Sequence, residues 1–296
     1  MKSCIIFNPA ARGEKAQLFR RFLEDIGDQA AFKPTWAPGV ATDLAKAAVE
    51  EGFENIIAAG GDGTLNEVLN GIGKAKDGFK KARLGILPLG TINVFAKELG
   101  LPEKVDQAWE VVRRGNHRDV DLPYANFKSD GEQQRRYFAQ LAGAGLDAEA
   151  IALVDWESKR RFRNLAYVFA GVRALFRKQH RIQVTAGDRT ETGELILIGN
   201  GRYYGGRLPV FADARLDDGR IDVCVFPNVG FHTCLRFGFW LFVERYWTST
   251  PLPCFQAEKI SLTSSTDARF EVEGDLAGPL PLEIGVQPRG LRVICP

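Results

Sequence analysis

Hydrophobic and polar positions alternate in two different ways along the 296-residue chain. Up to about residue 115, short apolar runs end in glycine-rich turns, and longer segments with the 3.6-residue period of helices separate them. The apolar runs at residues 4–7, 56–59 and 84–87 predict buried strands, and residues 16–26 predict a helix. This alternation is typical of an α/β layer with a parallel sheet.

A different pattern begins near residue 120. The dipeptide Asp130-Gly131 lies in a polar stretch between two apolar segments, which predicts a β-hairpin. Further short strands are predicted at residues 181–187, 194–201, 219–226 and 258–264. Residues 157–178 carry apolar side chains at helical spacing and predict one amphipathic helix. We therefore expect an α/β domain over residues 1–120 and a mostly β domain over residues 121–296, whose last strand could return to the first domain.

Composition and charge exclude several classes of protein. The chain is 45% hydrophobic and 26% charged, which is typical of a globular protein rather than a disordered or collagen-like one. A net charge of +2 gives no reason to expect binding to nucleic acid. The first apolar run is too short for a signal peptide, and residues 229–243 are too few and too polar to span a bilayer. We therefore expect a cytoplasmic protein.

Cysteine and histidine offer few sites for chemistry. The five cysteines are widely scattered, without the close spacing of a zinc site or a disulfide framework, so we expect reduced thiols. The three histidines have no neighbours typical of a metal site or a catalytic triad. Each histidine is therefore expected to be a surface or packing residue.

Polar loops follow the predicted strands of the first domain, at residues 8–13, 60–64 and 88–93. Because ligands bind beyond the carboxyl ends of parallel strands, we expect the three loops to face one ligand. The glycines of the second loop let the backbone approach a phosphate at the start of a predicted helix. Asp62, in the middle of this loop, suits either a metal contact or a base that accepts a proton from an attacking hydroxyl. A tight turn capped by Asp62 is the simpler alternative, but Asn66 and Glu67 add polar groups that a cap does not need.

The segment GGDGTLNEVLNG at residues 60–71 resembles the signature of the diacylglycerol kinase catalytic-domain family, which includes bacterial lipid kinases, sphingosine kinases and ceramide kinases. The shorter GGDGT also occurs in NAD kinases. Two more segments resemble the lipid-kinase branch instead: Asn8-Pro9 followed by Arg12-Gly13, and PLGTINVFAKELGLP at residues 88–102. The resemblance is strong over about 115 residues and weaker to the C-terminus. It implies a phosphofructokinase-like α/β domain that binds ATP, followed by a C-terminal β-sandwich domain.

Carried over residue by residue, the resemblance implies a nucleotide site and several catalytic carboxylates. The residues implied to bind the nucleotide are Asn8, Arg12, Thr35, Gly60, Gly61, Gly63, Thr64, Glu67, Gly90, Thr91 and Asn93. Asp62 is the first candidate for the catalytic base. Glu273 and Asp275 take the places of the aspartate and glutamate in the family's V-D-G-E, so the two side-chain lengths are exchanged and their individual roles stay open. Val94, where many members carry aspartate, indicates either a different acceptor or a packing choice.

The turn at residues 213–222 resembles a magnesium-binding loop of bacterial family members. The resemblance implies Leu216, Asp217 and Asp218 as ligands, through carboxylate and carbonyl oxygens. An Asp-Gly hairpin turn is the alternative. ATP and Mg²⁺ are the implied cofactors.

The implied reaction is transfer of the γ-phosphate of ATP to a lipid hydroxyl. Diacylglycerol, which would give phosphatidic acid, is the first choice of acceptor. A sphingoid base, ceramide or another lipid alcohol is the alternative. A nucleotide- or lipid-binding protein without turnover is the alternative from another class.

A basic segment suggests how a lipid is reached. Residues 159–181 contain eight Lys and Arg and no acidic residue, and a basic amphipathic helix can rest on an anionic bilayer. Packing against the second domain is the alternative for its apolar face. The aromatic residues 237–247 are a second candidate for lipid contact, although core packing is their more common use. A lipid substrate and transient peripheral membrane contact are therefore expected, nucleic acid is not, and a homodimer is left open.

Overall fold

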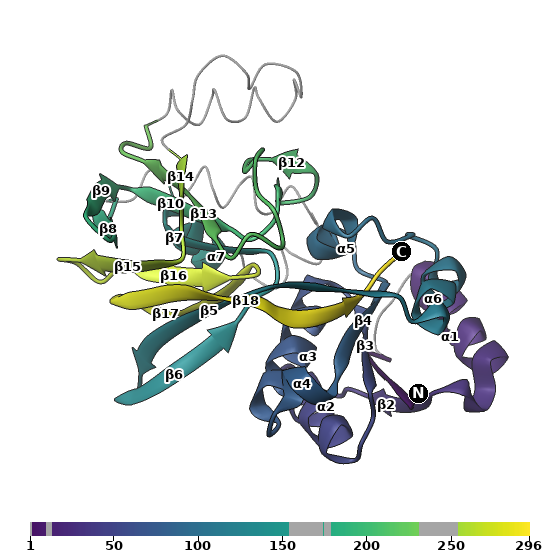
Figure 1. Ribbon diagram of the computed structural model, residues 1–296. Helices are drawn as coiled ribbons and strands as arrows, with labels where there is room; N and C mark the ends of the chain where they lie inside the picture. The colour runs from purple at the N-terminus through teal and green to yellow at the C-terminus, as the bar shows by residue number, and fades with distance from the viewer. Residues whose placement is uncertain (1, 10–13, 154–173, 175–178, 231–253) are drawn as a thin grey trace.

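Two long strands, β5 (His117–Ser129) and β18 (Leu282–Ile294), join an α/β layer to a β-sandwich (Figure 1). The computed structural model describes residues 2–9, 14–153, 174, 179–230 and 254–296. Both chain termini lie beside the α/β layer (Figure 1). The expected fold class, an α/β domain followed by a β-sandwich, is confirmed.

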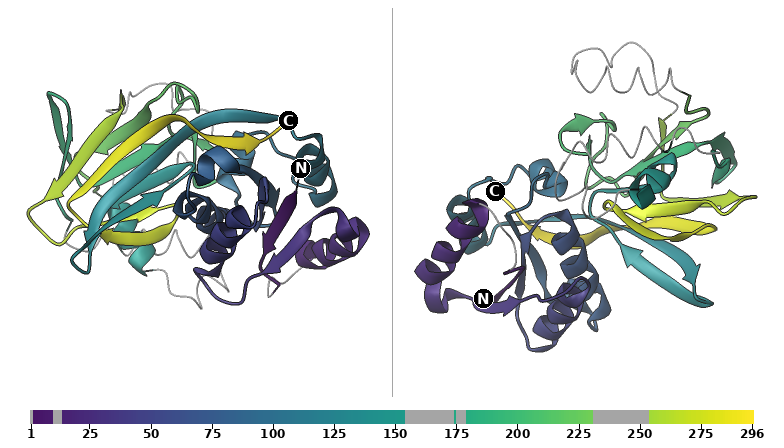
Figure 2. Two further views of the ribbon diagram at one scale, coloured as in Figure 1. Left: turned by 60° about the horizontal axis from the view of Figure 1, so that its bottom comes forward. Right: turned by 180° about the vertical axis from the view of Figure 1, so that it is seen from behind.

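The α/β layer is built on parallel strands in the order β2-β1-β3-β4. These strands are β1 (Ser3–Phe7), β2 (Ala31–Pro34), β3 (Asn55–Gly60) and β4 (Arg83–Pro88). The helices of this layer are α1 (Glu14–Ile26), α2 (Val40–Glu50), α3 (Asp62–Lys74), α4 (Gly78–Lys81), α5 (Val94–Glu98) and α6 (Val105–Arg114), with a 3₁₀ turn at Gly27–Gln29. Helices cover both faces of the sheet (Figure 2), so β3 and β4 are apolar almost throughout rather than alternating. The strands and the helix predicted for this half are confirmed.

The β-sandwich packs two sheets around an apolar core. One sheet has the order β14-β13-β10-β7-β16-β17, and the other is formed by β6, β5, β18, β15, β8 and β9. The bounds are β6 (Glu132–Tyr137), β7 (Leu141–Gly145), β8 (Ile182–Ala186), β9 (Arg189–Gly193), β10 (Leu195–Gly199), β13 (Ile221–Phe226), β14 (Cys254–Ala257), β15 (Lys259–Ser264), β16 (Arg269–Val272) and β17 (Asp275–Pro279). Helix α7 (Leu146–Leu153) follows β7, and a small ribbon joins β11 (Tyr203–Tyr204) to β12 (Leu208–Pro209).

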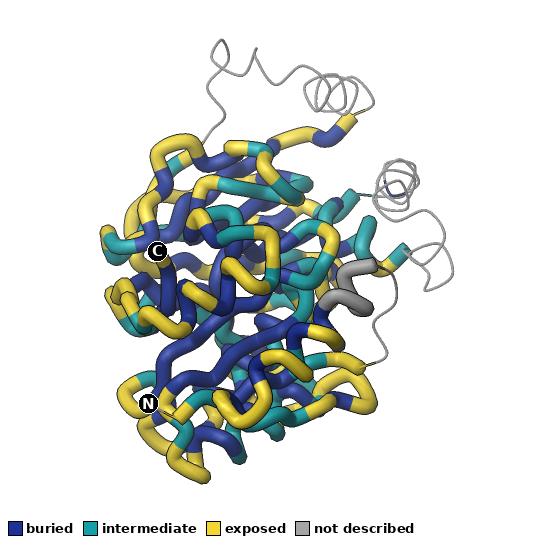
Figure 3. Tube along the Cα trace, turned by 90° about the vertical axis from the view of Figure 1, so that its right-hand side faces the viewer, coloured by how far each residue is buried: buried dark blue, intermediate teal, exposed yellow. Residues whose placement is uncertain are grey.

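Alternation along the strands explains the sandwich core. In β15, for example, Ile260 and Leu262 are buried while Lys259 and Ser261 are exposed. Buried strands run through the middle of the molecule and exposed segments form its rim (Figure 3). The predicted hairpin is the β5–β6 connection, in which Asp130 and Gly131 both have positive φ, as a two-residue turn with right-handed strand twist requires. The four further predicted strands are confirmed as β8, β10, β13 and β15.

Strand β18 reaches into both halves of the molecule. It pairs with β5 and β15 on the sandwich side and, at Val293, with Leu84 of β4 in the α/β layer. One ten-stranded sheet therefore runs through both halves. The boundary at residue 120 stays a prediction, and that residue lies inside β5.

The expectation of reduced thiols is wrong for one pair of cysteines. Cys224 of β13 lies opposite Cys254 of β14 in register, and the two form a disulfide across 30 residues of sequence. Spacing along the chain did not show this pair because strand register is set by tertiary packing. Cys4 and Cys295 are buried free thiols.

Three segments singled out from the sequence lie wholly or mostly outside the described residues: the basic helix at 157–178, the apolar run at 229–243 and the aromatic run at 237–247. Arg12 also lies outside them. Within the described part of the chain, no helix has the length and apolar character needed to cross a bilayer.

Candidate active site

The second and third glycine loops lie against each other at the carboxyl ends of β3 and β4. The Gly60 carbonyl accepts hydrogen bonds from the N–H groups of Leu89 and Gly90, at 2.9 and 3.1 Å. A Cβ added to Gly90 would come within 2.5 Å of the Gly61 Cα, so a side chain at this position would push the loops apart. Glycine at these positions therefore joins the two loops into one surface.

Helix α3 opens directly from this surface. No side chain caps its N-terminus at Gly61, and a Cβ on Gly63 would meet no atom within 4 Å. An uncapped helix N-terminus presents unpaired N–H groups and the positive end of the helix dipole. The residues present therefore fit a nucleotide phosphate.

Asp62 connects the helix to the third loop. Its Oδ1 atom accepts a hydrogen bond from the Val94 N–H at 2.8 Å, where α5 begins. Burial raises the pKa of Asp62, and the Val94 N–H opposes this rise only in part. The Val94 side chain is 5% exposed, so a buried apolar group stands where many family members carry aspartate. This burial favours the packing interpretation of the Val94 departure.

Most other residues predicted for the nucleotide lie at the same edge of the sheet. Asn8 follows β1, and Thr35 follows β2 and donates its N–H to the Phe7 carbonyl at 2.8 Å. Asn93 is buried with φ of 51°, and its amide donates to the Gly90 carbonyl, which shapes the third loop. Thr64 packs beneath Gly60, and Thr91 is exposed. Nucleotide contact by these residues stays a prediction.

Glu67 has a different partner from the one expected at a nucleotide pocket. Its carboxylate accepts the N–H groups of Gly39 and Ala41, at 2.9 and 3.1 Å, and so caps the N-terminus of α2. A carboxylate with two backbone donors at a helix N-terminus stabilises the packing of α2 against α3. The structure thus shows a scaffold contact for Glu67, and its nucleotide contact stays a prediction.

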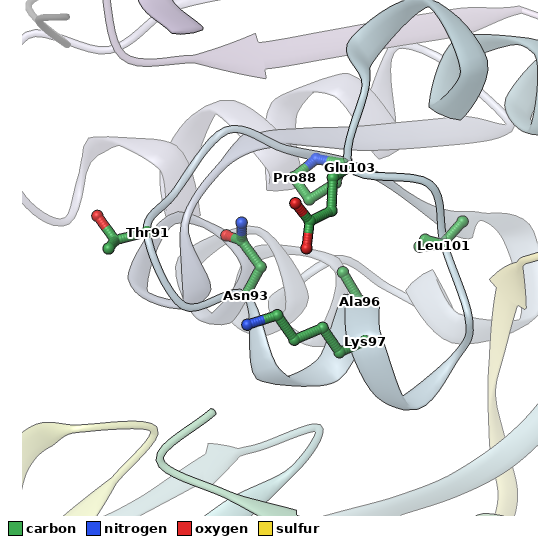
Figure 4. A pocket seen from close by; sticks show the side chains of 7 residues that line it. All are labelled: Pro88, Thr91, Asn93, Ala96, Lys97, Leu101 and Glu103. Carbon is green, nitrogen blue, oxygen red and sulfur yellow. The ribbon is translucent and has the colours of Figure 1, made fainter. Parts of the chain in front are cut away.

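A small cavity lies beside the third loop (Figure 4). It has a volume of about 30 Å³ and is lined by Pro88, Thr91, Asn93, Ala96, Lys97, Leu101 and Glu103. The Asn93, Lys97 and Glu103 side chains gather near one another, while the Thr91 side chain points away from them (Figure 4). This volume suits about one water molecule, so the cavity is too small to be the nucleotide site itself.

Glu273 occupies the two-residue turn between β16 and β17. It and Gly274 have φ of 55° and 81°, which is the backbone pattern of a tight hairpin turn. Glutamate adopts the left-handed region at a cost that glycine, asparagine and aspartate largely avoid. The Glu273 Oε1 atom accepts hydrogen bonds from the N–H groups of Ala139 and Gln140, at 2.8 and 2.7 Å, and the residue is 8% exposed. Glu273 therefore keeps an unfavourable backbone conformation at the position where its buried carboxylate is fixed by two backbone N–H donors.

The environment of Glu273 changes its acidity. Its pKa is raised from 4.5 to about 7, mainly by burial and in part by the negative charge of Asp62, against the opposing effect of the N–H groups of Gln140, Ala139 and Leu141. Asp62, from the α/β half, therefore lies near enough to Glu273, from the sandwich, for its charge to act on that carboxyl group. A carboxyl group that titrates near pH 7 is suited to accept a proton in catalysis.

Asp275 lies in a wetter setting than Glu273. Its side chain is 52% exposed and lies 3.5 Å from the Arg136 guanidinium. The structure therefore distinguishes the two candidate carboxylates of this turn: Glu273 is buried and held by backbone donors, and Asp275 is an exposed partner of arginine.

The sequence interpretation missed a buried carboxyl pair behind this turn. Asp147 accepts a hydrogen bond from the Tyr204 hydroxyl at 2.6 Å, and Glu271 accepts one from the Gly274 N–H at 2.7 Å. Their remaining oxygens, Asp147 Oδ2 and Glu271 Oε1, are buried beside Gly143 and interact with each other. Burial raises the pKa of both groups, which favours a proton shared between them. Glu271 within an apolar strand and Asp147 shortly after another were the available signal, but only the pairing of β16 with β7 shows that they meet.

The turn predicted to bind magnesium has its oxygens engaged by protein groups. The Leu216 carbonyl accepts the Asp121 N–H at 2.6 Å, and Asp218 accepts the Arg220 N–H. Asp217 lies 3.5 Å from Arg215 and 3.9 Å from Arg118. No three acidic, histidine or cysteine side chains among the described residues gather as a metal-binding group. These oxygens have protein partners in this structure, and magnesium binding by Leu216, Asp217 and Asp218 stays a prediction.

Two family models match this chain, one over the α/β half and one over the β-sandwich. A family model for the diacylglycerol kinase catalytic domain matches residues 2–125, and one for the YegS C-terminal NAD kinase beta sandwich-like domain matches residues 140–295. The diacylglycerol kinase of Staphylococcus saprophyticus is 31% identical over 94% of this chain and 90% of its own length. The diacylglycerol kinase of Bacillus subtilis is 28% identical over 99% and 95%.

Solved structures show the same fold. A diacylglycerol kinase from Bacillus anthracis superposes with a TM-score of 0.76 at 22% identity, over 100% of this chain and 97% of its own. Yeast NADH kinase, solved with NADH, gives a TM-score of 0.54 at 9% identity, over 99% and 82%. From the matches to the two family models and the identity over most of the chain, we conclude that this chain belongs to the diacylglycerol kinase family of lipid kinases.

Proposed function

We propose that this lipid kinase transfers the γ-phosphate of ATP to the hydroxyl of diacylglycerol and so forms phosphatidic acid. The observation that carries the proposal is the buried Glu273 carboxyl, with a pKa of about 7 and Asp62 acting on it, beside the open N-terminus of α3. The relatives named as diacylglycerol kinases support the choice of acceptor.

The glycine loops and α3 would hold the nucleotide. Phosphoryl transfer depends on positioning and on neutralising charge, because the transferred group carries negative oxygens throughout. Backbone N–H groups at the start of α3 offer partial positive charge there, and the absence of a side chain at Gly63 leaves room for close approach. ATP is expected to arrive as its magnesium complex, in which the metal offsets phosphate charge.

Glu273 is the proposed base. The N–H groups of Ala139 and Gln140 donate to Oε1, and the Leu141 N–H also acts on the carboxylate; Oε2 is assigned to accept the proton of the lipid hydroxyl. The hydroxyl oxygen then forms a bond to the γ-phosphorus as the bond to the β-phosphate oxygen breaks, and ADP leaves with that electron pair. Asp62, the first choice from sequence, already accepts the Val94 N–H and is assigned the supporting role of raising the pKa of Glu273.

The test is transfer of label from γ-labelled ATP to a panel of lipid alcohols in mixed micelles: diacylglycerol, monoacylglycerol, sphingosine and ceramide, with NAD as the non-lipid control. Label in phosphatidic acid is expected. Glu273→Gln is expected to lower that transfer by about 100-fold or more, since it removes the proposed base. The exposed Asp275→Asn serves as the matched control and is expected to lower it by less than about threefold.

The other outcomes point to the alternatives. Label in sphingosine or ceramide instead would overturn the acceptor while keeping the phosphoryl transfer. ATP binding without label in any acceptor would favour a binding protein without turnover. Because diacylglycerol resides in membranes, we also propose transient contact with a lipid bilayer, which sedimentation with anionic vesicles would test.

A further inference from the structure

Residues 137–140, which we call the bridge segment, form hydrogen bonds to both halves of the molecule. The segment runs from the end of β6 to the start of β7, so it belongs to the sandwich by sequence. It contacts α3 and α5 of the α/β layer at its two ends and Glu273 near its centre. The bridge segment therefore connects the helices of the glycine loops with the turn that carries Glu273.

Asn70 holds the first end of the bridge segment to α3. Its Oδ1 atom accepts the Tyr137 N–H at 2.8 Å, and its amide nitrogen donates to the Tyr137 carbonyl at 2.9 Å. One side chain thus satisfies both backbone groups of one residue, which is a geometrically specific contact. Asn70 lies eight residues after Asp62 on the same helix, so it is about 12 Å along the axis from the phosphate end.

Glu98 holds the other end to α5. The Gln140 amide donates to Glu98 Oε2 at 3.3 Å and to the Tyr203 carbonyl at 2.9 Å. Glu98 Oε2 also accepts the Arg202 N–H at 2.8 Å, and the Glu98 side chain is only 5% exposed. α5 begins at the third glycine loop, so this contact connects that loop with the bridge segment.

The centre of the bridge segment holds the proposed base. The two hydrogen bonds to Glu273 come from the N–H groups of Ala139 and of Gln140, and Gln140 is also the residue anchored to Glu98. Asn200 donates its amide to the Ala139 carbonyl at 2.8 Å and fixes the same stretch from the sandwich side. A displacement of either end therefore moves the donors that hold Glu273.

We propose that Asn70 and Glu98 are positioning residues, which fix the Glu273 carboxylate relative to the glycine loops through the bridge segment. The inference rests on the proposed function where it takes Glu273 as the base. Each residue lies on a helix that starts at a glycine loop, so the distance from phosphate to base is set by these two contacts. A displacement of about 1 Å at a reacting group is enough to cost about 100-fold in rate.

The activity test uses Asn70→Ala in two backgrounds. In the native background kcat is expected to fall by about 100-fold, with the KM for ATP changed by less than about twofold. In the Glu273→Gln background the same substitution is expected to lower kcat by less than about twofold further, because the residue acts through Glu273. Equal losses in both backgrounds would overturn the inference. Asn126→Ala, which removes an asparagine hydrogen-bonded elsewhere in the sandwich, is the control expected to leave kcat unchanged.

A pH titration tests the positioning role of Asn70 without any substrate, so its result does not depend on which lipid is the acceptor. The pH dependence of unfolding, compared between a protein that carries Glu273 and its Glu273→Gln variant, reports the pKa of Glu273 without any substrate. The same comparison is made in the Asn70→Ala background. The charged groups that act on Glu273 are Asp62 of α3 and Glu271 of β16, and neither is substituted in any of these proteins. Asn70→Ala loosens the two N–H donors and is expected to raise that pKa by about half a unit or more.

Each result bears on one proposal. If no lipid is phosphorylated, the proposed function fails, and the titration still decides the positioning role of Asn70. An unchanged pKa of Glu273 in the Asn70→Ala protein would overturn that role. Should Asn70→Ala fail to fold, Glu98→Ala takes its place, because it removes the carboxylate that accepts from the Gln140 amide and the Arg202 N–H. The same loss of kcat and the same rise in pKa are expected, and no change in either would overturn the inference.

Discussion

Replacing Glu273 by glutamine is expected to stabilise the protein above neutral pH and to remove most of its activity. Glutamine has the size of glutamate, and its single carbonyl oxygen can accept the N–H groups of both Ala139 and Gln140, because both bonds already fall on Oε1. The substitution therefore removes the ionisable group and keeps the contacts. Stability and activity should then change in opposite directions.

The magnitude follows from the pKa of Glu273. Its folded-state pKa is raised from 4.5 to about 7, so the folded state holds a proton that the unfolded chain releases at lower pH. The stability contribution is fully present below pH 4.5 and is lost as the pH rises through about 7. At about 1.4 kcal/mol per pKa unit, the loss is on the order of 3 kcal/mol by pH 8. Glu273→Gln avoids this loss.

The assay is urea-induced unfolding of both proteins at pH values from about 3.5 to 8. The difference in free energy of unfolding should be flat at the acid end, rise in favour of Glu273→Gln between about pH 5 and 7, and level off above it. Phosphoryl transfer should fall by about 100- to 10,000-fold, the range for loss of a general base. A pH-independent difference would refute the assigned environment of Glu273, and full activity in the variant would refute its role as base.

Three further predictions concern the loops, the carboxyl pair and the disulfide. Gly90→Ala should lower the free energy of unfolding in urea by about 2 kcal/mol, because its Cβ meets the backbone of the second loop. Gly63→Ala should keep the stability of the native protein, because its Cβ meets no protein atom, and should raise the KM for ATP about tenfold where the phosphates are proposed to bind. The free energy of unfolding of Glu271→Gln should rise by on the order of 1 kcal/mol relative to that of the native protein above neutral pH, because the amide takes the place of the shared proton. Unfolding measured at acid and at alkaline pH checks this. A lower free energy of unfolding for the variant at alkaline pH would contradict it. Cys224 and Cys254 should resist alkylation without reductant, and reduction should lower the free energy of unfolding by about 2–4 kcal/mol; labelling of both would contradict the bridge.

The α/β half shows how far sequence alone leads. Glycines and polar residues that end apolar runs predicted the second and third loops correctly, because parallel strands place their carboxyl ends at one edge whatever the rest of the fold does. The buried strands and the Asp130-Gly131 hairpin were equally local signals. These features need only the order of residues along a short stretch of chain.

The contacts that define the candidate site are not local. Glu273 accepts hydrogen bonds from residues 133 and 134 positions earlier, and Asp147 meets Glu271 only because β7 pairs with β16. The Cys224–Cys254 disulfide likewise depends on the register of β13 and β14. Periodicity predicts that a strand exists and which face it buries, but register and partner choice come from packing of the whole chain. The cap that Glu67 supplies to α2 was missed for the same reason.

The central claim is that Glu273 accepts the proton of a diacylglycerol hydroxyl during phosphoryl transfer. The most direct test is the pH dependence of kcat/KM for phosphatidic acid formation, measured for the native protein and for Glu273→Gln. The native profile should rise through an apparent pKa of about 7, and the residual activity of the variant should lose that limb. The same limb in both proteins, or none in the native protein, would contradict the account.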